Sequence, residues 1–128
     1  HIIGNGVDII KNSRINNSLK TKGFLNRIFT EKEIQQGTKL KNKINFYAKR
    51  FAAKEAFVKA IGTGFRSDIN FIDIEIKNYK NGKPYISLSK KLNNYLQKKF
   101  KIQKYKVFLS LSDEKDYSIA FVVIDKKI

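Results

Sequence analysis

The stretch KRFAAKEAFVKAIGTGF, residues 49–65, decides how the rest of this sequence can fold. Apolar residues recur in it and just before it at spacings of mostly three or four, the period of an amphipathic helix, and its alanines favour helix further. Gly62 and Gly64 then end the pattern, so a helix is predicted over 42–61. One carboxylate, Glu55, lies in this helix among basic residues, which raises the question of what it pairs with.

Strand and helix patterns alternate on both sides of this central helix. Strands are predicted over 1–10, 70–78, 85–88, 105–112 and 117–125, and further helices over 12–22, from 30 onward and over 89–100. The order β–α–α–α–β–β–α–β–β fits neither a parallel βαβ repeat nor an all-β protein. It predicts an α+β fold in which a mostly antiparallel sheet packs against helices.

Short local signals mark several element boundaries. Thr30 followed by Glu33 is the capping-box pattern of a helix start, and Asn12 or Ser13 is expected to cap the first helix. The Asn-Gly pair at 81–82 predicts a tight hairpin. Two glycines are expected to loosen the first strand, and the second strand is expected to have an apolar and an acidic face. These residues are Gly4 and Gly6, then Ile72, Ile74 and Ile76 on one face and Asp73 and Glu75 on the other.

Composition limits the class of protein. The 128 residues are predicted to form a single domain over 1–128, and their 41% hydrophobic content argues against disorder. The chain has no cysteine, no apolar run of the roughly 18–20 residues that span a bilayer and no recognisable secretory signal, so a cytoplasmic protein is expected. The formal net charge of +16 favours an acidic partner, which could be a nucleic acid, an anionic membrane, a phosphorylated small molecule or an acidic protein.

The residue types exclude several kinds of catalytic site. The only histidine is His1 and there is no cysteine, which removes the usual nucleophile–base pairs and zinc sites. The sequence contains neither GxGxxG nor the Walker-type GxxxxGK[ST] motif. Phosphate chemistry in this chain would therefore depend on carboxylates, lysines, arginines, backbone amides and a hard cation.

Two carboxylates are the candidates for such chemistry, and each has an alternative reading. Asp8 interrupts the apolar segment GVDII and either faces solvent or needs a partner. Glu55 and Lys59 are one helical turn apart and either form an ordinary i,i+4 pair or share a site. In a shared site, Asp8 and Glu55 would hold Mg²⁺, Lys59 would meet a phosphate, and the glycines of Gly62-Thr63-Gly64 would let backbone approach the ligand.

Six segments taken together resemble one known family. They are GVDII, RIFTEKEI at 27–34, the stretch at 49–65, INFIDIEI at 69–76, NGKPYISL at 81–88 and LSLSDE at 109–114. In this order they closely resemble the bacterial holo-acyl-carrier-protein synthases, the small type of 4'-phosphopantetheinyl transferase, over essentially the whole chain. The resemblance implies the fold of that family and transfer of the phosphopantetheine arm of coenzyme A to a serine of apo-acyl carrier protein in fatty acid biosynthesis, with release of adenosine 3',5'-bisphosphate.

The resemblance also implies roles for individual residues. Asp8 and Glu55 match the two protein ligands of Mg²⁺, and Lys59 matches a lysine that contacts coenzyme A phosphate. Arg14 matches a position that docks the acidic carrier protein, with Lys22 and Arg27 as further candidates for the same surface. A homotrimer with active sites between subunits is implied, with no nucleic-acid or membrane partner. The residues matching the regions that line the coenzyme site are Gly62, Thr63, Gly64, Asn81, Gly82, Lys83 and Pro84.

One position departs from the family pattern and leaves rival interpretations open. Many relatives carry histidine after the LS-x-S strand, where it contacts coenzyme phosphate, whereas this chain has Asp113. The protein could therefore be an inactive relative that only binds carrier protein. A basic nucleic-acid-binding domain is the other rival, in which Phe108 and Tyr117 would be stacking platforms.

Overall fold

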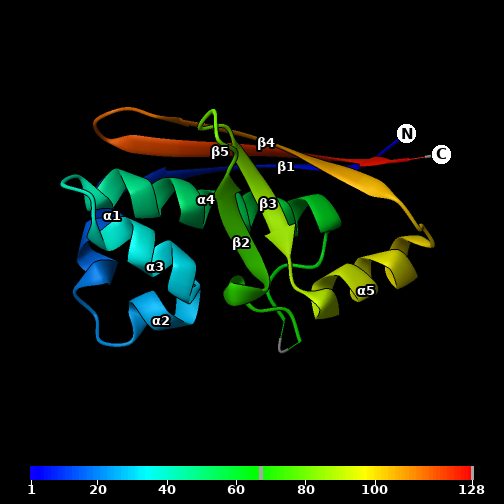
Figure 1. Cartoon of the computed structure of the whole chain (residues 1–128), viewed down its shortest axis with the longest axis horizontal. Helices are drawn as coiled ribbons and strands as arrows, with labels where there is room; N and C mark the ends of the chain where they lie inside the picture. Colours follow the sequence, from blue (N-terminus) through cyan, green and yellow to red (C-terminus); the bar gives the residue numbers. More distant parts are fainter. Residues whose placement is uncertain (67, 128) are drawn as a thin grey trace.

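Helix α4 (Lys43–Ile61) runs through the middle of the molecule, and the other elements pack around it (Figure 1). The computed structural model describes residues 1–66 and 68–127, so the final residue of the domain predicted over 1–128 lies outside the described part. Before α4 come β1 (Ile2–Lys11), α1 (Asn12–Leu19), α2 (Phe24–Ile28) and α3 (Glu31–Thr38). After it come a 3-10 turn η1 (Phe71–Asp73), β2 (Ile74–Asn78), β3 (Pro84–Leu88), α5 (Lys90–Phe100), β4 (Tyr105–Asp113) and β5 (Tyr117–Lys126).

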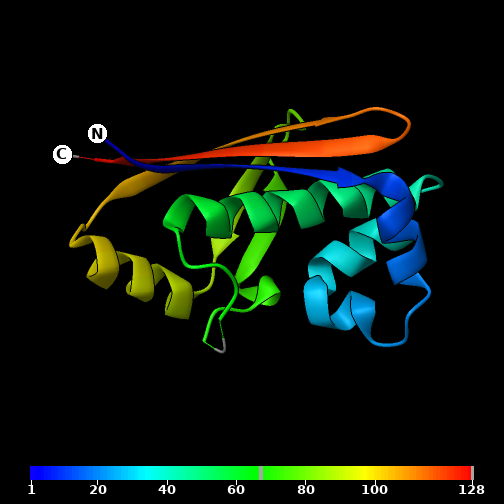
Figure 2. The same cartoon turned by 180° about the vertical axis from the view of Figure 1, so that it is seen from behind.

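The strands form antiparallel sheets, which confirms the α+β prediction. They divide between a three-stranded sheet of order β1–β5–β4 and a separate hairpin of β2 and β3. The large sheet covers one side of α4, while the hairpin crosses α4 on another side (Figures 1 and 2). Helices α1, α2 and α3 gather at one end of the molecule and α5 lies at the other.

The core lies between α4 and the inner face of the large sheet. Ala52, Ala56 and Phe57 on α4 are fully buried, as are Ala120 and Val122 on β5. A helix that buries residues on several sides belongs in the interior, and each large apolar side chain removed from water there stabilises the fold by about 1.5–3 kcal/mol. The predicted helix over 42–61 is confirmed, and it ends at Gly62 in the left-handed conformation with φ 76°.

Two glycines bring β1 against the backbone of α4. A Cβ atom on Gly4 would lie 2.0 Å from the carbonyl oxygen of Ala60, and one on Gly6 would lie 2.0 Å from that of Ala56. Only glycine fits at either position, because backbone atoms cannot give way to a side chain. The predicted loosening of the strand is confirmed at Gly4, since the β1–β5 register shifts between Ile2 and Gly4, and is wrong at Gly6, which stays in register opposite Val122. Both glycines permit close packing.

The outer face of the large sheet is apolar and exposed. Val7 lies opposite Phe121 and Ile9 lies opposite Ile119 in the β1–β5 pairing, and all four side chains are exposed. Phe108 on β4 is exposed as well. A contiguous apolar patch on a small protein usually marks a contact surface for another molecule.

Some local predictions are wrong for reasons that the tertiary contacts explain. Asn12 is the first residue of α1 rather than its cap, because its side chain donates to the carbonyls of Glu114 and Lys115. Asp73 belongs to η1 instead of a strand, and its carboxylate accepts from the backbone N–H of Asn70 and the hydroxyl of Ser89. The capping box at Thr30 and the hairpin at 81–82 are confirmed. Among the described residues, no helix has both the length and the apolar character to cross a bilayer.

Candidate active site

Asp8 lies on β1 with its side chain directed at α4. Strand alternation places Val7 and Ile9 on the exposed outer face and turns Asp8 inward, where its side chain keeps 15% of its surface exposed. The reading in which Asp8 faces solvent is therefore wrong. Its Oδ1 accepts a hydrogen bond from Lys59 Nζ at 3.0 Å, so this carboxylate has a partner from the helix.

Glu55 reaches the same place from α4. Burial raises the pKa of its carboxyl above the ordinary value of 4.5, the charge of Asp8 raises it further, and Lys59 and Arg14 act in the opposite direction. In the described part of the chain no ion pair joins Glu55 to Lys59, because Lys59 donates to Asp8 and to the carbonyl of Val7. The i,i+4 reading is therefore wrong. We call Asp8, Glu55 and Lys59 the open cluster, because the Lys59 side chain is 53% exposed.

The open cluster has the donor atoms that a hard cation requires. Asp8 and Glu55 supply carboxylate oxygens, the ligand type that Mg²⁺ prefers, and Mg²⁺ is commonly held by one or two carboxylates plus substrate phosphates. The charge of Asp8 disfavours ionisation of Glu55, and a cation between the carboxylates would relieve this repulsion. Across residues 1–66 and 68–127, no group of three or more His, Cys, Asp or Glu side chains is placed to hold a metal, so any further ligands would come from substrate or water.

The basic residues of the N-terminal segment are exposed, and Arg14 is the one with an observed effect on the open cluster. Arg14 on α1 is exposed, and its charge lowers the pKa of Glu55, so it belongs to the surroundings of the open cluster. Lys22 lies exposed in the turn after α1, and Arg27 lies exposed in the last turn of α2. Helix α2 itself was not predicted from the sequence.

The segment Gly62-Thr63-Gly64 directly follows α4, whose last turn carries Lys59. The N–H of Gly62 donates to the carbonyls of Val58 and Lys59, which closes the last helical turn. Gly64 has φ 64°, and the hydroxyl of Thr63 donates to the Gly64 carbonyl. The structure therefore places the predicted segment 62–64 directly after the helical turn that carries Lys59.

The hairpin predicted to line the coenzyme site lies elsewhere in this chain. Strands β2 and β3 cross α4 on a different side from β1, and the turn that joins them lies beyond α4 beside the large sheet (Figures 1 and 2). Gly82 has φ 90°, Lys83 N–H donates to the Asn81 side chain, and Pro84 begins β3. Arg50 anchors the hairpin to α4 by donating to Asn78 Oδ1 at 2.9 Å. Among the described residues, no hydrogen bond or ion pair joins this turn to the open cluster.

Asp113 at the end of β4 has its own partners. Its Oδ2 accepts from Asn45 Nδ2 at 2.7 Å, and Lys49 Nζ lies 3.4 Å from its Oδ1. Both partners lie in the first two turns of α4, before the open cluster. Asp113 thus forms an ion pair with a lysine and accepts a hydrogen bond from a side-chain amide.

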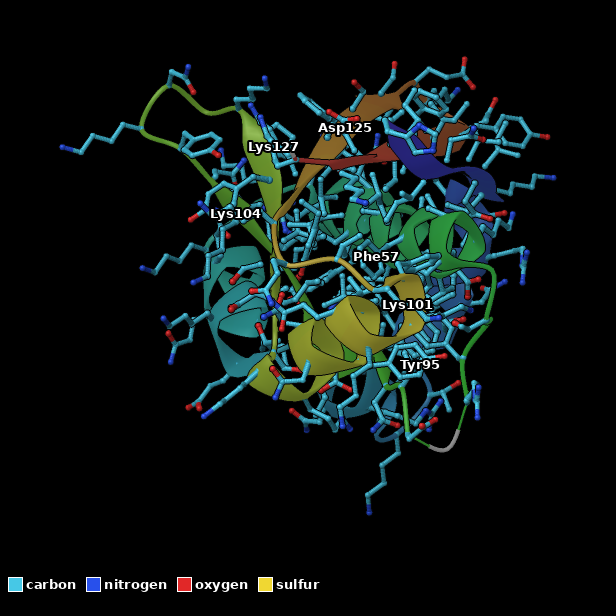
Figure 3. The ribbon with its side chains drawn as sticks, turned by 90° about the vertical axis from the view of Figure 1, so that its right-hand side faces the viewer. Phe57, Tyr95, Lys101, Lys104, Asp125 and Lys127 are labelled. Carbon is cyan, nitrogen blue, oxygen red and sulfur yellow. The ribbon has the colours of Figure 1, made fainter. Side chains whose placement is uncertain are left out.

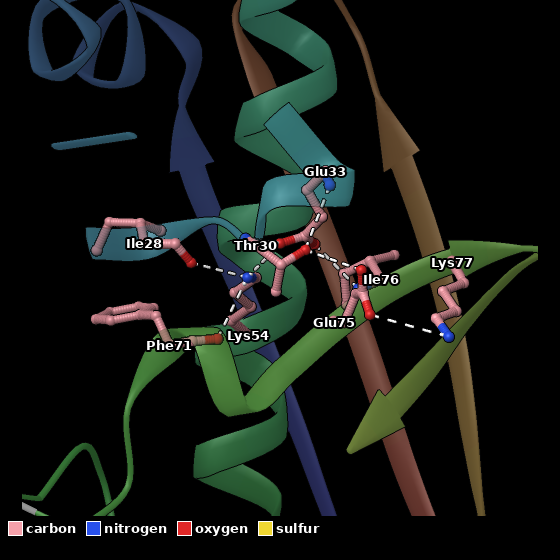
Figure 4. A network of polar contacts seen from close by, with 8 residues as sticks. All are labelled: Ile28, Thr30, Glu33, Lys54, Phe71, Glu75, Ile76 and Lys77. Atoms are coloured by element: carbon pink, nitrogen blue, oxygen red, sulfur yellow. Dashed lines mark hydrogen bonds and ion pairs between the residues drawn. The ribbon is translucent and has the colours of Figure 1, made fainter. Parts of the chain in front are cut away.

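A second cluster on α4 was missed in the sequence. Lys54, next to Glu55, is fully buried, and its ammonium donates to Glu33 Oε1 at 2.6 Å and to the carbonyls of Ile28 and Phe71 at 2.8 and 3.2 Å (Figure 4). Three donors thus meet three acceptors. Burial lowers the pKa of Lys54, and Glu33 opposes this shift. We call Lys54 and Glu33 the closed cluster.

Both carboxylate oxygens of Glu33 accept hydrogen bonds, as all three protons of its partner Lys54 are donated. Its Oε1 also accepts from Thr30 N–H at 2.9 Å, and its Oε2 accepts from Ile76 N–H at 3.0 Å. The Thr30–Glu33 capping pattern in the sequence predicted only the bond from the Thr30 N–H to Glu33. The closed cluster joins α3, α4 and β2, so its role in this chain is to fix these elements against one another.

Comparisons with known proteins identify relatives of this chain. Residues 4–122 match the 4'-phosphopantetheinyl transferase superfamily. A holo-(acyl-carrier-protein) synthase of Pelagibacter ubique is 52% identical over 126 residues, which is 98% of each chain.

Solved structures extend this similarity to the fold. The holo-(acyl-carrier-protein) synthase of Neisseria meningitidis has a TM-score of 0.87 at 39% identity, over 98% of this chain and 100% of that one. The synthase of Bacillus anthracis, solved in complex with CoA (3',5'-ADP), has a TM-score of 0.82 at 38% identity over 98% of each chain.

Proposed function

The chain belongs to the 4'-phosphopantetheinyl transferase superfamily, among its holo-(acyl-carrier-protein) synthases, and we propose that it modifies an acidic acyl carrier protein in fatty acid biosynthesis. In the proposed reaction a serine oxygen of the carrier protein bonds to the phosphorus that carries the pantetheine arm of coenzyme A. The bond from that phosphorus to the other half of coenzyme A breaks, adenosine 3',5'-bisphosphate leaves, and the serine proton is released. A cytoplasmic location stays a prediction.

The open cluster is the observation that carries this proposal. Asp8 from β1 and Glu55 from α4 are held near each other by the close packing that Gly4 and Gly6 permit. They are the residues that would hold Mg²⁺. When bound, the ion would neutralise charge on the pyrophosphate as the phosphorus–oxygen bond breaks.

Lys59 is proposed to bind a coenzyme phosphate. Its ammonium is half exposed and donates to Asp8, and a surface pair of this kind is worth little, so the side chain can turn to an incoming anion at small cost. The glycines at 62 and 64, one turn further on, would let the backbone approach the same ligand. Both features support a phosphate subsite next to the carboxylates.

The carrier protein is proposed to dock beside this site on Arg14, with Lys22 and Arg27 on the same surface. All three side chains are exposed, and the charge of Arg14 already acts on Glu55. A net charge of +16 would speed encounter with an acidic protein in a salt-dependent way.

A homotrimer with active sites between subunits is proposed on two grounds. The exposed apolar face of the large sheet, with Val7, Ile9, Ile119 and Phe121, is suited to burial against another copy. The hairpin of β2 and β3 crosses α4 on a different side from β1, the strand that carries Asp8, so a neighbouring subunit would supply the turn over 81–84. Sedimentation of the purified protein tests the assembly.

The rival readings gain little support from the site. Phe108 and Tyr117 lie exposed on the outer sheet face, which also carries Phe121 and aliphatic side chains, and a contiguous apolar face of this kind is suited to contact with another copy of the chain. Asp113 is paired with Lys49, so its charge is offset before any phosphate arrives. These contacts favour an active transferase.

Intact-mass spectrometry tests the proposed function directly. Apo-acyl carrier protein is incubated with this protein, coenzyme A and Mg²⁺, with EDTA in a parallel sample. A mass gain of one phosphopantetheine arm that is lost with EDTA supports the reaction and its metal dependence. No gain, with a carrier protein that another transferase does modify, overturns the proposal and favours a binding-only relative.

A further inference from the structure

An open cleft lies at the end of the molecule where α5 meets the large sheet. It has a volume of about 1060 Å³ and is lined by residues of β3, α5, β4 and the C-terminal segment. Figure 3 looks at this end and shows Lys104 and Lys127 close together above α5; the Lys127 N–H donates to the Lys104 carbonyl at 2.9 Å. None of the residues of the open cluster lines this cleft.

Two strand edges open on this cleft. Within the described chain, β3 pairs only with β2, and β4 pairs only with β5, so each strand is the edge of its sheet. Ile86 and Leu88 line the cleft from β3, and Tyr105 and Val107 line it from β4. An unpaired strand edge presents N–H and C=O groups to which an extended peptide can add.

The rim of the cleft is basic and unneutralised. Its charged lining residues are Lys90, Lys104, Lys106 and Lys127, of which Lys106 directs its ammonium over the ring of Phe108, and no carboxylate lines it among the described residues. None of these four ammonium groups takes part in an ion pair within the described chain. The sequence extends this asymmetry, since residues 76–112 contain many lysines and neither Asp nor Glu.

The floor of the cleft distinguishes among acidic partners. Ile86, Leu88 and Val107 are aliphatic and half-buried, and the hydroxyl of Tyr105 is already bonded to Asn93. A single-stranded nucleic acid gains affinity by stacking its bases on exposed aromatic rings, and the described lining of this cleft offers one half-buried ring, that of Tyr105. A peptide gains from aliphatic contact and from backbone pairing at the same time.

We propose that this cleft binds an extended peptide segment in which apolar and acidic residues alternate, and that the segment pairs with the free edge of β4 near Tyr105–Val107. Alternate side chains of a strand point to opposite sides, so apolar residues would rest on the floor while acidic residues meet the lysine rim. This docking surface is separate from the open cluster and does not depend on the proposed transferase reaction.

Fluorescence anisotropy with a labelled peptide of about ten residues, alternating Glu and Val, tests the proposal on the full chain. The double variant Lys90→Glu/Lys104→Glu is expected to raise the Kd at least about tenfold. The matched control Lys39→Glu/Lys41→Glu changes the net charge equally at exposed positions outside the cleft and is expected to leave the Kd within about twofold. A peptide with a central proline, which cannot complete strand pairing, should bind more weakly than the parent peptide.

Backbone hydrogen exchange distinguishes strand pairing from general charge attraction, because charge attraction alone does not slow amide exchange in β4. The Glu–Val peptide is expected to slow exchange at the start of β4, and a Glu–Ser peptide of equal charge should do so much less. The proposal is overturned if the peptide does not bind, if both double variants weaken it equally, or if proline has no effect. Binding of single-stranded RNA that the cleft variant alone weakens, without peptide binding, would assign the cleft to nucleic acid instead.

Discussion

Two charge clusters lie on neighbouring residues of α4 and differ in almost every physical respect. In the closed cluster, Lys54 and Glu33 are 0% and 1% exposed, and each of their charged atoms has hydrogen-bond partners. In the open cluster, Glu55 has no ion pair within the described chain, and Lys59, which is half exposed, pairs with Asp8. Lys54 and Lys59, two of the lysines of α4, thus have opposite surroundings.

The difference shows how one helix can serve both structure and chemistry. A buried ion pair must be fully hydrogen-bonded because desolvation is costly, so the closed cluster leaves no atom free for a ligand. The open cluster holds two carboxylates, and the charge of Asp8 adds to burial in raising the pKa of Glu55, although Lys59 and Arg14 act in the opposite direction. Fully hydrogen-bonded charges mark the structural cluster, and a carboxylate with no ion pair among the described residues marks the candidate site.

The largest effect is expected from breaking the closed cluster. Lys54→Met would leave the Glu33 carboxylate and two backbone carbonyls buried without their donor, so we expect a loss of about 3–5 kcal/mol in the free energy of unfolding. The control Lys59→Met removes the exposed lysine and should cost less than about 1 kcal/mol. Urea unfolding of both variants measures the contrast, and equal losses would remove the distinction between the clusters.

Removing a carboxylate from the open cluster should affect turnover and leave the fold intact. Glu55→Gln deletes a proposed metal ligand, so we expect metal-dependent turnover to fall by on the order of 10²–10³-fold or more. Glu31→Gln, an exposed carboxylate on α3, is the matched control and should retain wild-type rates. Rates from the mass-spectrometric assay and Mg²⁺ titration by calorimetry are the measurements. A near-wild-type rate for Glu55→Gln would exclude this residue from the site.

Changing the proposed carrier-protein surface at Arg14 should affect the KM for carrier protein and not the KM for coenzyme A. Arg14→Glu is expected to raise the KM for carrier protein about tenfold and to leave the KM for coenzyme A nearly unchanged, because a cation that faces an acidic partner becomes an anion. Lys41→Glu, exposed between α3 and α4, is the charge-matched control. Since Arg14 also acts on Glu55, a change in kcat alone would show that it works through the open cluster and not through docking.

Glu55 should also make stability depend on pH in the absence of metal. Its folded pKa is raised above 4.5, mainly by burial, so the unfolded state loses this proton first and stability falls as pH rises through the raised pKa. Glu55→Gln should therefore be more stable than wild type near pH 7 and about equal to it near pH 4. Urea unfolding in EDTA at both pH values tests this. A variant that is less stable near pH 7 would contradict the assigned cause.

The smallest effect is expected at Asp113, and it tests whether this residue belongs to the coenzyme site. Because Asp113 is held by Asn45 and Lys49, we expect Asp113→His to preserve or slightly improve affinity for coenzyme A, by less than about threefold. Calorimetric titration measures this affinity. A large weakening would show that Asp113 has a function of its own in binding.

Many elements could be predicted because their signals are local. The capping box at Thr30, the Asn-Gly turn at 81–82 and the glycine stop at Gly62 each act within a few residues, and all three are present. Helix α2 was missed because it has five residues, no side-chain cap and too little length for a helical period. The division of the strands between two sheets was missed because strand patterns do not name their partners.

The candidate site was predicted in part. Asp8 and Glu55 were found because carboxylates in apolar segments stand out, and the structure turns both toward the contact between β1 and α4. The closed cluster gave no comparable signal, since Glu33 and Lys54 each look like one more charged residue on a helix. The role of Gly6 was misread because the backbone that it touches lies some fifty residues away along the chain.

The sequence by itself determined the order of elements apart from α2 and η1, the central helix, the antiparallel α+β class and the resemblance to a transferase family. These follow from side-chain periodicity and capping, which are short-range, and from motifs that can be read in order. Only the tertiary structure decided which lysine of α4 is buried and which is available. That choice depends on which surfaces lose water when distant segments pack, and desolvation is a property of the assembled fold.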